Sequence, residues 1–567
     1  MPVINLSLSK LKEYAQNRAS EAQILETLPY LGLDIEGTAG DTVSVEYSPN
    51  RPDYSSEVGI ARSLLGMLGI RTGLPLYNFP RSTFEIEVPG KENPIFKVRP
   101  HIFGLVCDIA VDEALIKQLI AMQEDLHNGL GRKRSLLAIG IHNAEVITER
   151  IRYYATTDPT FSFVPLGSSR KMTIEEVLAT TDQGIKYGGL VKPLGAFPIL
   201  EDSAGHLLSM PPIINGELTR LKDGISRLFI DVTATDARAG DTATAIIASM
   251  LSDRGGRVLS VDVKSGGRLI RTTPDMTPQE MGFDLGLVNR EIGFSLSIEQ
   301  ASQYLEKCRL SLGGEGGELV AKIPRYRSDI VHPVDLAEEV ALGYGIQRIE
   351  PLETASALAG SFNRKLKRID RMIEILVGLE LTEVWNLSLV NSEQVSSTRA
   401  GSPLKVDNPK SQSFEFLRQD LTSSLLAVLG GTTDQEYPQK IFELAPVFQR
   451  SSDLQRHYTG VLEEQHAAAL IASKDANYTM AHSLLDSFLR PLEVPHEHRV
   501  LLRPLVKKSA ENRYFLEGRS AEVILAKEKD GENRIGMIGE IMPSAIDRYG
   551  LQVPIAGFEL NIEPLLG

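Results

Sequence analysis

Cysteine is almost absent from this chain: only Cys107 and Cys308 occur in 567 residues, and they lie far apart. Two isolated cysteines exclude a disulfide framework and a cysteine-rich zinc site, and they are typical of a protein of the reducing cytosol. No stretch approaches the roughly eighteen apolar residues of a membrane-spanning helix. The first residues also lack the basic and then apolar order of a secretory signal. We therefore expect a cytoplasmic protein without a membrane anchor.

Basic residues are also in deficit. The chain has 60 Lys and Arg against 74 Asp and Glu, which gives a formal net charge of −14. Neutralisation of phosphates by basic groups supplies most of the affinity of proteins for nucleic acids. Two basic clusters exist, Arg132–Arg134 and Arg364–Arg371, but such clusters are more often solvated faces than binding sites. The acidity favours a protein that shares any nucleic acid with a partner subunit.

The length excludes a single hydrophobic core and predicts roughly three to five domains. Hydrophobic residues make up 42% and charged residues 24%, as is ordinary for a globular protein. The pattern along the chain predicts an α+β multidomain protein without internal repeats. The expected regions are a small mixed domain at 1–82, an α+β domain at 83–271, a small module at 272–352 and a last α+β domain at 361–567.

The first two regions contain both helical and strand periodicities. In the first, Leu11–Leu31 has helical spacing, Thr42–Tyr47 alternates like a strand, and Pro49–Asp53 forms a rigid turn before a helix at Ser56–Leu68. In the second, the predicted elements are strands at Ile102–Ala110, Leu136–Ile141 and Leu228–Thr235 and helices at Glu113–Leu126 and Thr242–Leu251. Ser209–Asn215 is unusual because two prolines beside an apolar run do not suit a central strand.

The third region is predicted to contain three helices. One begins at Thr277–Glu280, one spans Ser297–Cys308 with Ser297 as N-cap, and one spans Asp335–Tyr344. The glycine-rich Gly313–Gly317 is expected to be a hairpin turn, because no Lys-Ser/Thr pair follows it as in a phosphate loop. The last region begins with a basic helix and ends in Ala521–Glu559, where short strands alternate with turns.

Several segments together resemble the phenylalanyl-tRNA synthetase β subunit. They are Pro49–Asp53 followed by Gly59–Arg62; Gly131–Arg134 with Ala138–His142; Leu208–Asn215; Tyr326–Ile330 with Asp335–Val340 and Tyr344-Gly345; and Pro438–Glu443 with Gly536–Glu540. Each segment alone is weak evidence, whereas their order and spacing cover nearly the whole chain. The bacterial form of the family carries further domains for which this chain has no room. The compact archaeal and eukaryotic-cytosolic form is the closer match.

The resemblance implies a function for each region. Residues 83–271 would be an editing-like tRNA hydrolase, residues 272–352 a winged-helix-like module, and residues 361–567 a class II synthetase-like domain that binds a catalytic α subunit. The implied assembly contains two α and two β subunits together with the tRNA for phenylalanine. ATP and phenylalanine would bind to the α subunit, so this chain alone would not make aminoacyl-tRNA.

Four carboxylates form the first candidate site: Asp329, Asp335, Glu338 and Glu339. On a helix, Asp335 shares one face with Glu338 and Glu339. The spacing alone is typical of solvated acids at a helix start. The resemblance implies instead that these residues form the family's acidic magnesium site, and oxygen ligands suit Mg²⁺. The ion would be structural, because no nucleophile or base accompanies it.

The second candidate site follows from a limit of selectivity. Tyrosine is phenylalanine plus one hydroxyl, and an apolar pocket rejects an added hydroxyl by only about 10²-fold. The resemblance carries the family's editing positions onto Leu200, Ser209, Asn215, Asp231 and Thr233. Leu200 would line the ring pocket, and Ser209, Asn215 and Thr233 would hold the ester carbonyl or a water. Asp231 would either accept the proton of the tyrosine hydroxyl or orient that water.

Two common mechanisms of hydrolysis are not expected at this site. The sequence offers no Ser/His/Asp triad spacing and no cluster of zinc ligands, so neither acyl-enzyme nor metalloenzyme hydrolysis is expected.

The last region lacks an adenylation motif. Leu417–Leu421 stands near the second motif of class II synthetases, but Gly536, Gly539 and the distant Arg548 do not have the spacing of the ATP-binding arginine motif. A catalytically silent domain is therefore expected, and this absence opposes a self-sufficient ligase. A free-standing winged-helix regulator of nucleic acids is the other alternative, and the acidity and the large last domain oppose it.

Overall fold

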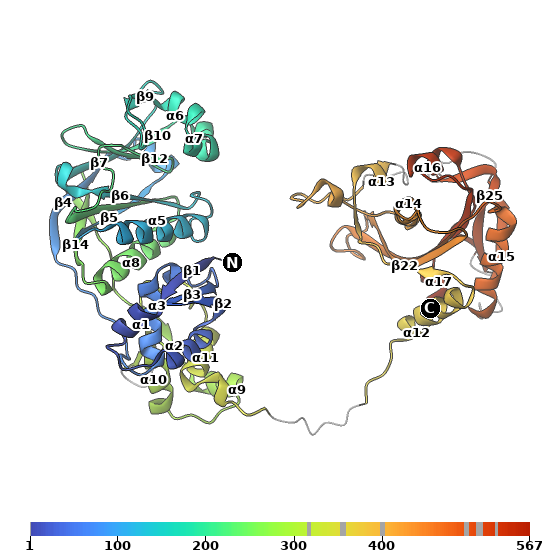
Figure 1. The fold of residues 1–567 in the computed structure, drawn as a ribbon, viewed down its shortest axis with the longest axis horizontal. Helices are drawn as coiled ribbons and strands as arrows, with labels where there is room; N and C mark the ends of the chain where they lie inside the picture. Colours follow the sequence, from blue (N-terminus) through green and yellow to red (C-terminus); the bar gives the residue numbers. More distant parts are fainter. Residues whose placement is uncertain are drawn as a thin grey trace. The chain divides into compact units, whose positions relative to one another are not determined.

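The computed structural model describes residues 2–314, 319–351, 359–396, 403–492, 498–505, 514–527 and 531–566. The chain divides into two compact units, residues 1–353 and residues 354–567, each drawn in Figure 1. Among the described residues, no helix has the length and apolar character needed to cross a membrane.

Unit 1 begins with a three-stranded sheet in the order β1-β3-β2, packed on short helices. Its elements are β1 (Val3–Ser7), α1 (Leu8–Tyr14), α2 (Glu21–Thr27), β2 (Leu33–Ala39), β3 (Thr42–Tyr47) and α3 (Glu57–Met67). The strand at Thr42–Tyr47 and the helix capped by Ser56 are confirmed. The single helical run at Leu11–Leu31 is wrong. Gln16 and Asn17 adopt left-handed φ angles that end α1, and Ser20 caps a new helix.

A ten-stranded sheet forms the centre of unit 1, in the order β12-β11-β10-β7-β4-β14-β5-β13-β6 with β15 paired to β14. Its strands are β4 (Arg81–Val88), β5 (His101–Asp108), β6 (Leu137–Asn143), β7 (Arg150–Thr156), β10 (Phe197–Asp202), β11 (Leu207–Met210), β12 (Ile214–Asn215), β13 (Arg227–Ala234), β14 (Arg257–Ser265) and β15 (Arg268–Thr273). Strand β4 runs parallel to β14 and β7, and the other pairs are antiparallel.

Helices α5 (Glu113–Asn128) and α8 (Ala237–Asp253) cover one face of this sheet, as Figure 1 shows. Asp112 and Asp236 cap them, and their apolar residues join those of β5, β6 and β13 in one core. The predicted helices and strands of this region are confirmed, although α8 begins before the predicted Thr242. The segment Ser209–Asn215 supplies β11 and β12, the last two strands at one end of the sheet, which agrees with its prolines.

The sheet curls so that its two ends meet. Ser209 of β11 pairs with Asn215 of β12, and the Asn215 side chain donates a hydrogen bond of 3.4 Å to the carbonyl of Ile141 in β6. Because β6 and β12 are the two end strands in the sheet order, this bond joins the ends of a near-barrel.

A small module completes unit 1. It contains β16 (Gln279–Gly282), α9 (Leu285–Ile292), α10 (Ile298–Lys307), β17 (Ser311–Gly313), β18 (Val320–Ile323) and α11 (Pro333–Tyr344). The N-cap Ser297 and the last helix are confirmed. The helix start at Thr277–Glu280 is wrong, because Gln279–Gly282 pairs with β18 as a strand. The predicted turn at Gly313–Gly317 lies mostly outside the described residues.

Unit 2 is built on a seven-stranded sheet in the order β19-β22-β23-β27-β26-β25-β24. The strands are β19 (Thr382–Glu383), β22 (Gln439–Arg450), β23 (Val461–Ala472), β24 (His498–Pro504), β25 (Phe515–Lys527), β26 (Gly531–Ile541) and β27 (Ile555–Asn561). Only the pair β19–β22 is parallel among these neighbours. The basic helix α12 (Arg364–Gly378) packs with α15 (Tyr478–Leu489) in one core. Unit 2 has a second apolar core, and helix α14 (Thr422–Gly431) contributes to it.

Candidate functional site

A cavity of about 260 Å³ lies where the two ends of the curled sheet meet. Ser209 and Asn215 from one end, Gly140 from β6 and Asp231 from β13 all line it, together with residues of α5. The structure thus brings together three of the five residues predicted as an editing site. Ser209 and Asp231 are 3% and 1% exposed, whereas Asn215 is half-buried.

The hydroxyl of Ser209 has no hydrogen-bond partner within the described part of the chain, although its Oγ atom is buried. Burying a hydroxyl without a partner is costly, so most buried hydroxyls in native proteins are paired. Ser209 lies on β11 opposite Leu200 of β10, and Ser209 is one of the residues that line the cavity. An unpaired hydroxyl at the wall of a cavity is available to a ligand or a water.

Asp231 is held by a histidine that the sequence reasoning passed over. His142 Nε2 lies 2.8 Å from Asp231 Oδ1, and its Nδ1 lies 2.8 Å from Thr219 Oγ1. Both side chains of the His142–Asp231 pair are almost fully buried. Because both ring nitrogens of His142 are occupied, neither is free to take a proton from Ser209. Ser209 and His142 are therefore not hydrogen-bonded as the nucleophile and base of a Ser/His/Asp triad would be.

Gly140 makes this pair possible. A Cβ atom at position 140 would lie 2.3 Å from Asp231 Oδ1 and 2.6 Å from His142 Nε2. Any side chain would therefore push the histidine and the aspartate apart. The signal that could have revealed His142 is a histidine near the end of an otherwise apolar strand, β6.

Leu200 and Thr233 do not line this cavity. Leu200 is fully buried in an apolar cluster that contains Phe84 and Phe229. This cluster is separate from the one formed with α5 and α8. Thr233 is also fully buried, and its Oγ1 accepts a hydrogen bond of 3.0 Å from Arg99 Nε. Arg99 also donates a hydrogen bond to the carbonyl of Arg134. Thr233 therefore helps to position Arg134 through Arg99 and does not itself face the cavity.

Arg134 fixes the proline segment. Its Nη1 donates to the carbonyls of Pro212 and Ile213, and its Nη2 donates to Glu124 Oε1 at 2.7 Å. Its guanidinium also lies 4.4 Å above the ring of Tyr187. A hydrogen bond from His127 and the charge of Arg134 lower the pKa of Glu124 to about 2. The basic cluster is thus divided: Arg132 and Lys133 are exposed, whereas Arg134 is an internal clamp.

The backbone at Arg132–Arg134 is unusual. The three residues have φ angles of 44°, 56° and 65°, a left-handed region that side chains disfavour. Hydrogen bonds from Arg134 N to His127 O and from Gly131 N to Leu126 O hold the turn. The strained turn ends at Arg134, the residue that binds the proline segment.

Two of the four carboxylates predicted to bind Mg²⁺, Asp329 before α11 and Glu339 within it, pair with an arginine. Arg327 Nη2 lies 2.6 Å from both Asp329 Oδ2 and Glu339 Oε1 and is itself buried. Burial would raise the pKa of Asp329, but the Arg327 charge outweighs it and holds that pKa below its ordinary value. Asp335 Oδ2 accepts hydrogen bonds from the backbone of Val331 and His332 and so caps α11.

Glu338 carries the unbalanced charge of this group. Partial burial and the nearby carboxylates of Glu339, Asp335 and Asp329 raise its pKa. Across the described ranges, no three His, Cys, Asp or Glu side chains are grouped so that they could hold a metal ion. The four carboxylates therefore do not form a ready-made coordination shell, because Arg327 pairs with two of them.

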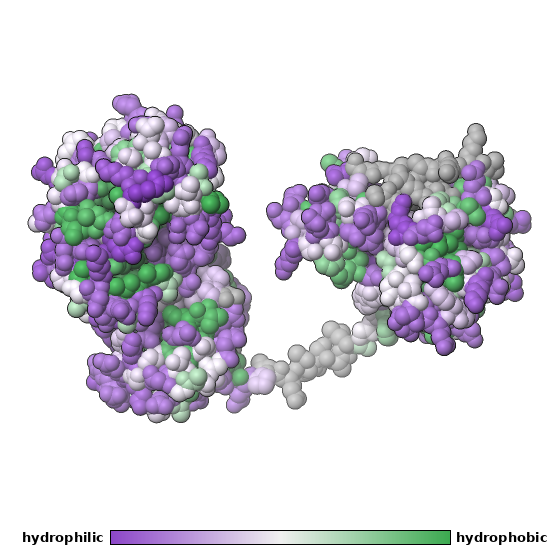
Figure 2. All heavy atoms as spheres, turned by 45° about the horizontal axis from the view of Figure 1, so that its top comes forward, coloured by the Kyte–Doolittle hydropathy of each residue, from purple (hydrophilic) through white to green (hydrophobic). Residues whose placement is uncertain are grey.

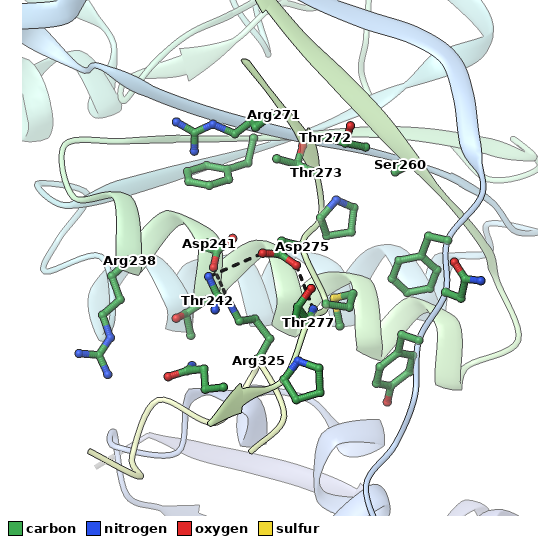
Figure 3. A pocket seen from close by; sticks show the side chains of 18 of the residues that line it. Arg238, Asp241, Thr242, Ser260, Arg271, Thr272, Thr273, Asp275, Thr277 and Arg325 are labelled. Carbon is green, nitrogen blue, oxygen red and sulfur yellow. Dashed lines mark hydrogen bonds and ion pairs between the residues drawn. The ribbon is translucent and has the colours of Figure 1, made fainter. Parts of the chain in front are cut away.

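A larger cavity, of about 870 Å³, lies beside α8 and β15 in unit 1 (Figure 3). Arg325 lies between two acids there: its Nε donates to Asp241 at 2.5 Å, and its Nη2 is 3.9 Å from Asp275. Arg271 lies 4.8 Å from the Phe103 ring. None of the predicted site residues lines this cavity, so size alone does not identify the functional site.

In unit 2, Arg418, the arginine of the segment that resembles the second synthetase motif, is buried and hydrogen-bonded within the domain. Arg418 is 1% exposed, its Nη1 donates to Glu443 Oε1 at 2.7 Å, and its Nε donates to the carbonyl of Pro446 at 3.0 Å. Asn386 donates to the second oxygen of Glu443. The guanidinium is therefore used inside the domain.

Comparisons with known proteins agree with this architecture. The model of the tRNA synthetase B5 domain matches residues 281–346, and the model of the phenylalanyl tRNA synthetase beta chain CLM domain matches residues 350–562. Both models describe domains of tRNA synthetases. The small module and unit 2 thus correspond to defined parts of that class of protein.

Full-length relatives narrow the class. The chain is 36% identical to the phenylalanine–tRNA ligase beta subunit of Archaeoglobus fulgidus, over 99% of this chain and 98% of the relative. It is 32% identical to that of Pyrococcus abyssi over the whole of both chains. A crystal structure of an N-terminal fragment of the Pyrococcus horikoshii phenylalanyl-tRNA synthetase beta subunit superposes with a TM-score of 0.57 at 32% identity. It covers 61% of this chain and 100% of the fragment.

The chain belongs to the family of phenylalanine–tRNA ligase β subunits. It is therefore a subunit of an aminoacyl-tRNA ligase, with an α subunit as partner and tRNA as a ligand of the assembly. This outcome excludes the free-standing regulator considered for the sequence.

Proposed function

We propose that residues 83–271 hydrolyse tRNA for phenylalanine that carries tyrosine by mistake. The observation that carries this proposal is the buried, unpaired hydroxyl of Ser209 in a cavity shared with Asn215 and Asp231. A cavity of about 260 Å³ suits an amino-acid side chain rather than a larger ligand. Deacylation of preformed Tyr-tRNA tests the proposal: substitution of Ser209 or Asp231 slows it while synthesis of Phe-tRNA persists.

The proposed roles follow from the contacts. Ser209 and Asn215 hold the ester carbonyl or the attacking water, since both present polar groups at the cavity wall. Asp231 accepts a hydrogen bond from the tyrosine hydroxyl, because His142 holds its other oxygen in place. A hydrogen bond to a charged group contributes about 1.5–3 kcal/mol. Phenylalanine cannot make it, and so the correct product is spared.

Substitution of Arg134 by alanine is expected to slow hydrolysis of Tyr-tRNA by about 10- to 10²-fold, because misplacement of positioned groups by about 1 Å costs that much. The change removes the bonds to Pro212 and Ile213 that fix the segment between Ser209 and Asn215. Arg132→Ala is the matched control, since Arg132 is exposed and two residues away. The rates of Tyr-tRNA hydrolysis by the two variants are compared at saturating Tyr-tRNA. Equal rates for the two variants would remove Arg134 from the positioning role.

We propose that residues 361–567 are a class II synthetase-like domain without adenylation activity that binds the α subunit in an assembly of two α and two β chains. ATP and phenylalanine would then bind to α. Large apolar side chains exposed in unit 2 support a contact surface: Phe362 (76%), Trp385 (95%), Leu387 (65%), Leu454 (63%) and Tyr458 (90%). Figure 2 shows green apolar patches among the purple surface of this unit. Apolar side chains that gather into a contiguous exposed patch are typical of interaction surfaces.

We further propose that residues 272–352 form a winged-helix-like module that binds Mg²⁺ through Asp329, Asp335, Glu338 and Glu339. Partial burial and the charges of Glu339, Asp335 and Asp329 raise the pKa of Glu338, and a cation at this position would offset that charge. The ion would have to compete with Arg327 for Asp329 and Glu339. Its contribution would be structural, because it would offset repulsion between the carboxylates and not activate a water.

Removal of Mg²⁺ by chelation is expected to lower the melting temperature of the wild-type chain more than that of Asp335→Asn. Binding to the folded state contributes about 2.7 kcal/mol at a hundredfold excess of ligand over Kd, and the variant loses part of it. Glu350→Gln serves as the control, since Glu350 is an exposed acid outside the cluster. Differential scanning fluorimetry measures the shifts. If all three proteins respond equally, the four carboxylates bind no Mg²⁺, and Asp329 and Glu339 are partners of Arg327 alone.

A further inference from the structure

A third cavity in unit 1, of about 540 Å³, is dominated by positive charge. It lies between α1, α3, the end of α8 and residue 309. Five basic side chains line it, against only two acidic ones. The basic residues are Lys10, Arg62, Arg71, Arg254 and Arg309, and the acidic residues are Glu13 and Asp253. None of these residues lines the cavity that contains Ser209 and Asp231.

Two of these arginines are buried and incompletely paired. Arg62 is 6% exposed: its Nε donates to Asp253 at 2.5 Å, but Nη1 and Nη2 find no partner within the described ranges. Arg309 is 4% exposed: its Nη1 donates to the carbonyl of Arg71 at 2.7 Å, and its Nε likewise lacks a partner there. Buried charged donors are normally paired, because leaving them unpaired is costly.

The neighbouring groups neutralise this charge only in part. Asp253 is shared between Arg62 and the hydroxyl of Tyr77. Burial lowers the pKa of Arg309, and the charges of Arg71 and Arg62 lower it further. The 870 Å³ cavity provides a contrast, because two aspartates there flank Arg325. Arg62 is better compensated: although burial opposes it, Tyr77, Asp253 and Tyr326 hold the pKa of Arg62 above its ordinary value, and its guanidinium lies 4.2 Å from the Tyr326 ring. The unmet donors are therefore Arg309 Nε and the two Nη atoms of Arg62, within the described part of the chain.

We propose that this cavity binds a phosphate group, supplied either by a free phosphate compound or by the backbone of RNA. Guanidinium groups present several N–H donors in a fixed plane that matches phosphate oxygens, and charge-assisted bonds of this kind are strong. The volume admits pyrophosphate or a single nucleotide unit. Arg62 and Arg309 are the buried anchors, and Arg71 is the exposed residue at the entrance. The proposal is independent of the editing assignment.

The first experiment uses the full-length chain co-expressed with its α subunit, in chloride buffer free of phosphate and sulfate. Inorganic phosphate and pyrophosphate are added separately at constant ionic strength while the melting temperature is followed. We expect a saturable increase in the wild type and in Arg257→Gln, a control arginine with 71% of its side chain exposed. Arg71→Gln and Arg309→Gln should lose most of this increase. Because Arg71 is exposed, its variant is expected to fold even if Arg309→Gln does not.

The second experiment measures binding of the tRNA for phenylalanine by the same proteins over a range of salt concentrations. If the phosphate comes from RNA, Arg71→Gln weakens binding about tenfold and reduces the salt slope by about one, whereas Arg257→Gln does neither. If it comes from a free compound, tRNA binding is unchanged and only the phosphate response is lost. The proposal is overturned if Arg71→Gln and Arg257→Gln respond alike to phosphate, to pyrophosphate and to tRNA.

Discussion

The isolated chain will show no phenylalanine-dependent exchange of ATP and pyrophosphate, and addition of the α subunit will produce it. The physical reason lies in unit 2, where Arg418 is buried and bound to Glu443 and Pro446. A buried ion pair that loses one partner leaves an uncompensated charge, so Arg418 is not free to turn toward ATP. The contacts of Arg418 therefore stabilise the domain, and they support the proposal that unit 2 has no adenylation activity.

The late glycines of unit 2 also have structural roles. A Cβ atom at Gly536 would lie 2.1 Å from the carbonyl of Glu559, and one at Gly539 would lie 2.5 Å from Ser520 Cβ. Both glycines therefore let strands of the sheet approach closely, rather than forming a loop around phosphates. Arg548 ends the separate helix α16 (Pro543–Arg548). These positions do not supply the arginine that adenylation needs.

Exchange is measured with labelled pyrophosphate for the purified chain, for α alone and for the two together. The isolated chain should fall about 10³-fold or more below the complex, because loss of even one electrostatic contact to a transition state costs about 10²–10³-fold. Mass spectrometry of the purified chain controls for traces of α. Robust exchange that persists after every trace of α is removed would refute the assignment of unit 2 as catalytically silent.

Much of the fold was predictable because local signals agreed with the tertiary structure. The amphipathic pattern of α5, the apolar run of β13 and the Ser297 cap of α10 each specify one element. The failures occurred where local signals were ambiguous. Thr277–Glu280 reads as a helix start by residue type, but pairing with β18 decides its conformation.

The candidate site was less predictable, because it depends on the closure of a sheet. Ser209, Asn215 and Asp231 lie on three strands, and only the curl that brings β12 to β6 places them around one cavity. Leu200 and Ser209 are cross-strand neighbours, yet Leu200 is buried in a core. Residue types alone do not reveal that His142 holds Asp231 or that Arg134 clamps the prolines.

Ser209→Ala and Asp231→Ala are expected to slow hydrolysis of Tyr-tRNA by about 10²-fold or more, as loss of a positioned polar group does in other hydrolytic sites. Ser209→Ala removes a hydroxyl that has no other partner in the described residues, so the fold loses nothing with it. Asp231→Ala deprives the buried His142 of its partner and destabilises the domain as well. Asp231→Asn retains a hydrogen-bonding group and separates the two effects.

Ser203→Ala and Asp223→Asn are the matched controls, since both residues are exposed and lie outside the cavity. Each variant is assembled with α and assayed for deacylation of preformed Tyr-tRNA and Phe-tRNA and for synthesis of Phe-tRNA. Synthesis should stay near the wild-type rate, because the synthetic site is proposed to lie in α. Loss of synthesis in step with hydrolysis would indicate misfolding or a lost subunit contact, which Asp231→Asn and the melting temperature would reveal.

The ratio of the two deacylation rates distinguishes the possible roles of Asp231. If Asp231 accepts the tyrosine hydroxyl, Asp231→Asn reduces the preference for Tyr-tRNA over Phe-tRNA, since about 1.5–3 kcal/mol of discrimination comes from that bond. If Asp231 orients the water instead, both rates fall together and the preference is kept. Ser209→Ala should lower both rates in either case, because the ester is common to the two substrates. Hydrolysis of Tyr-tRNA at the wild-type rate by both Ser209→Ala and Asp231→Asn would rule out this cavity as the editing site.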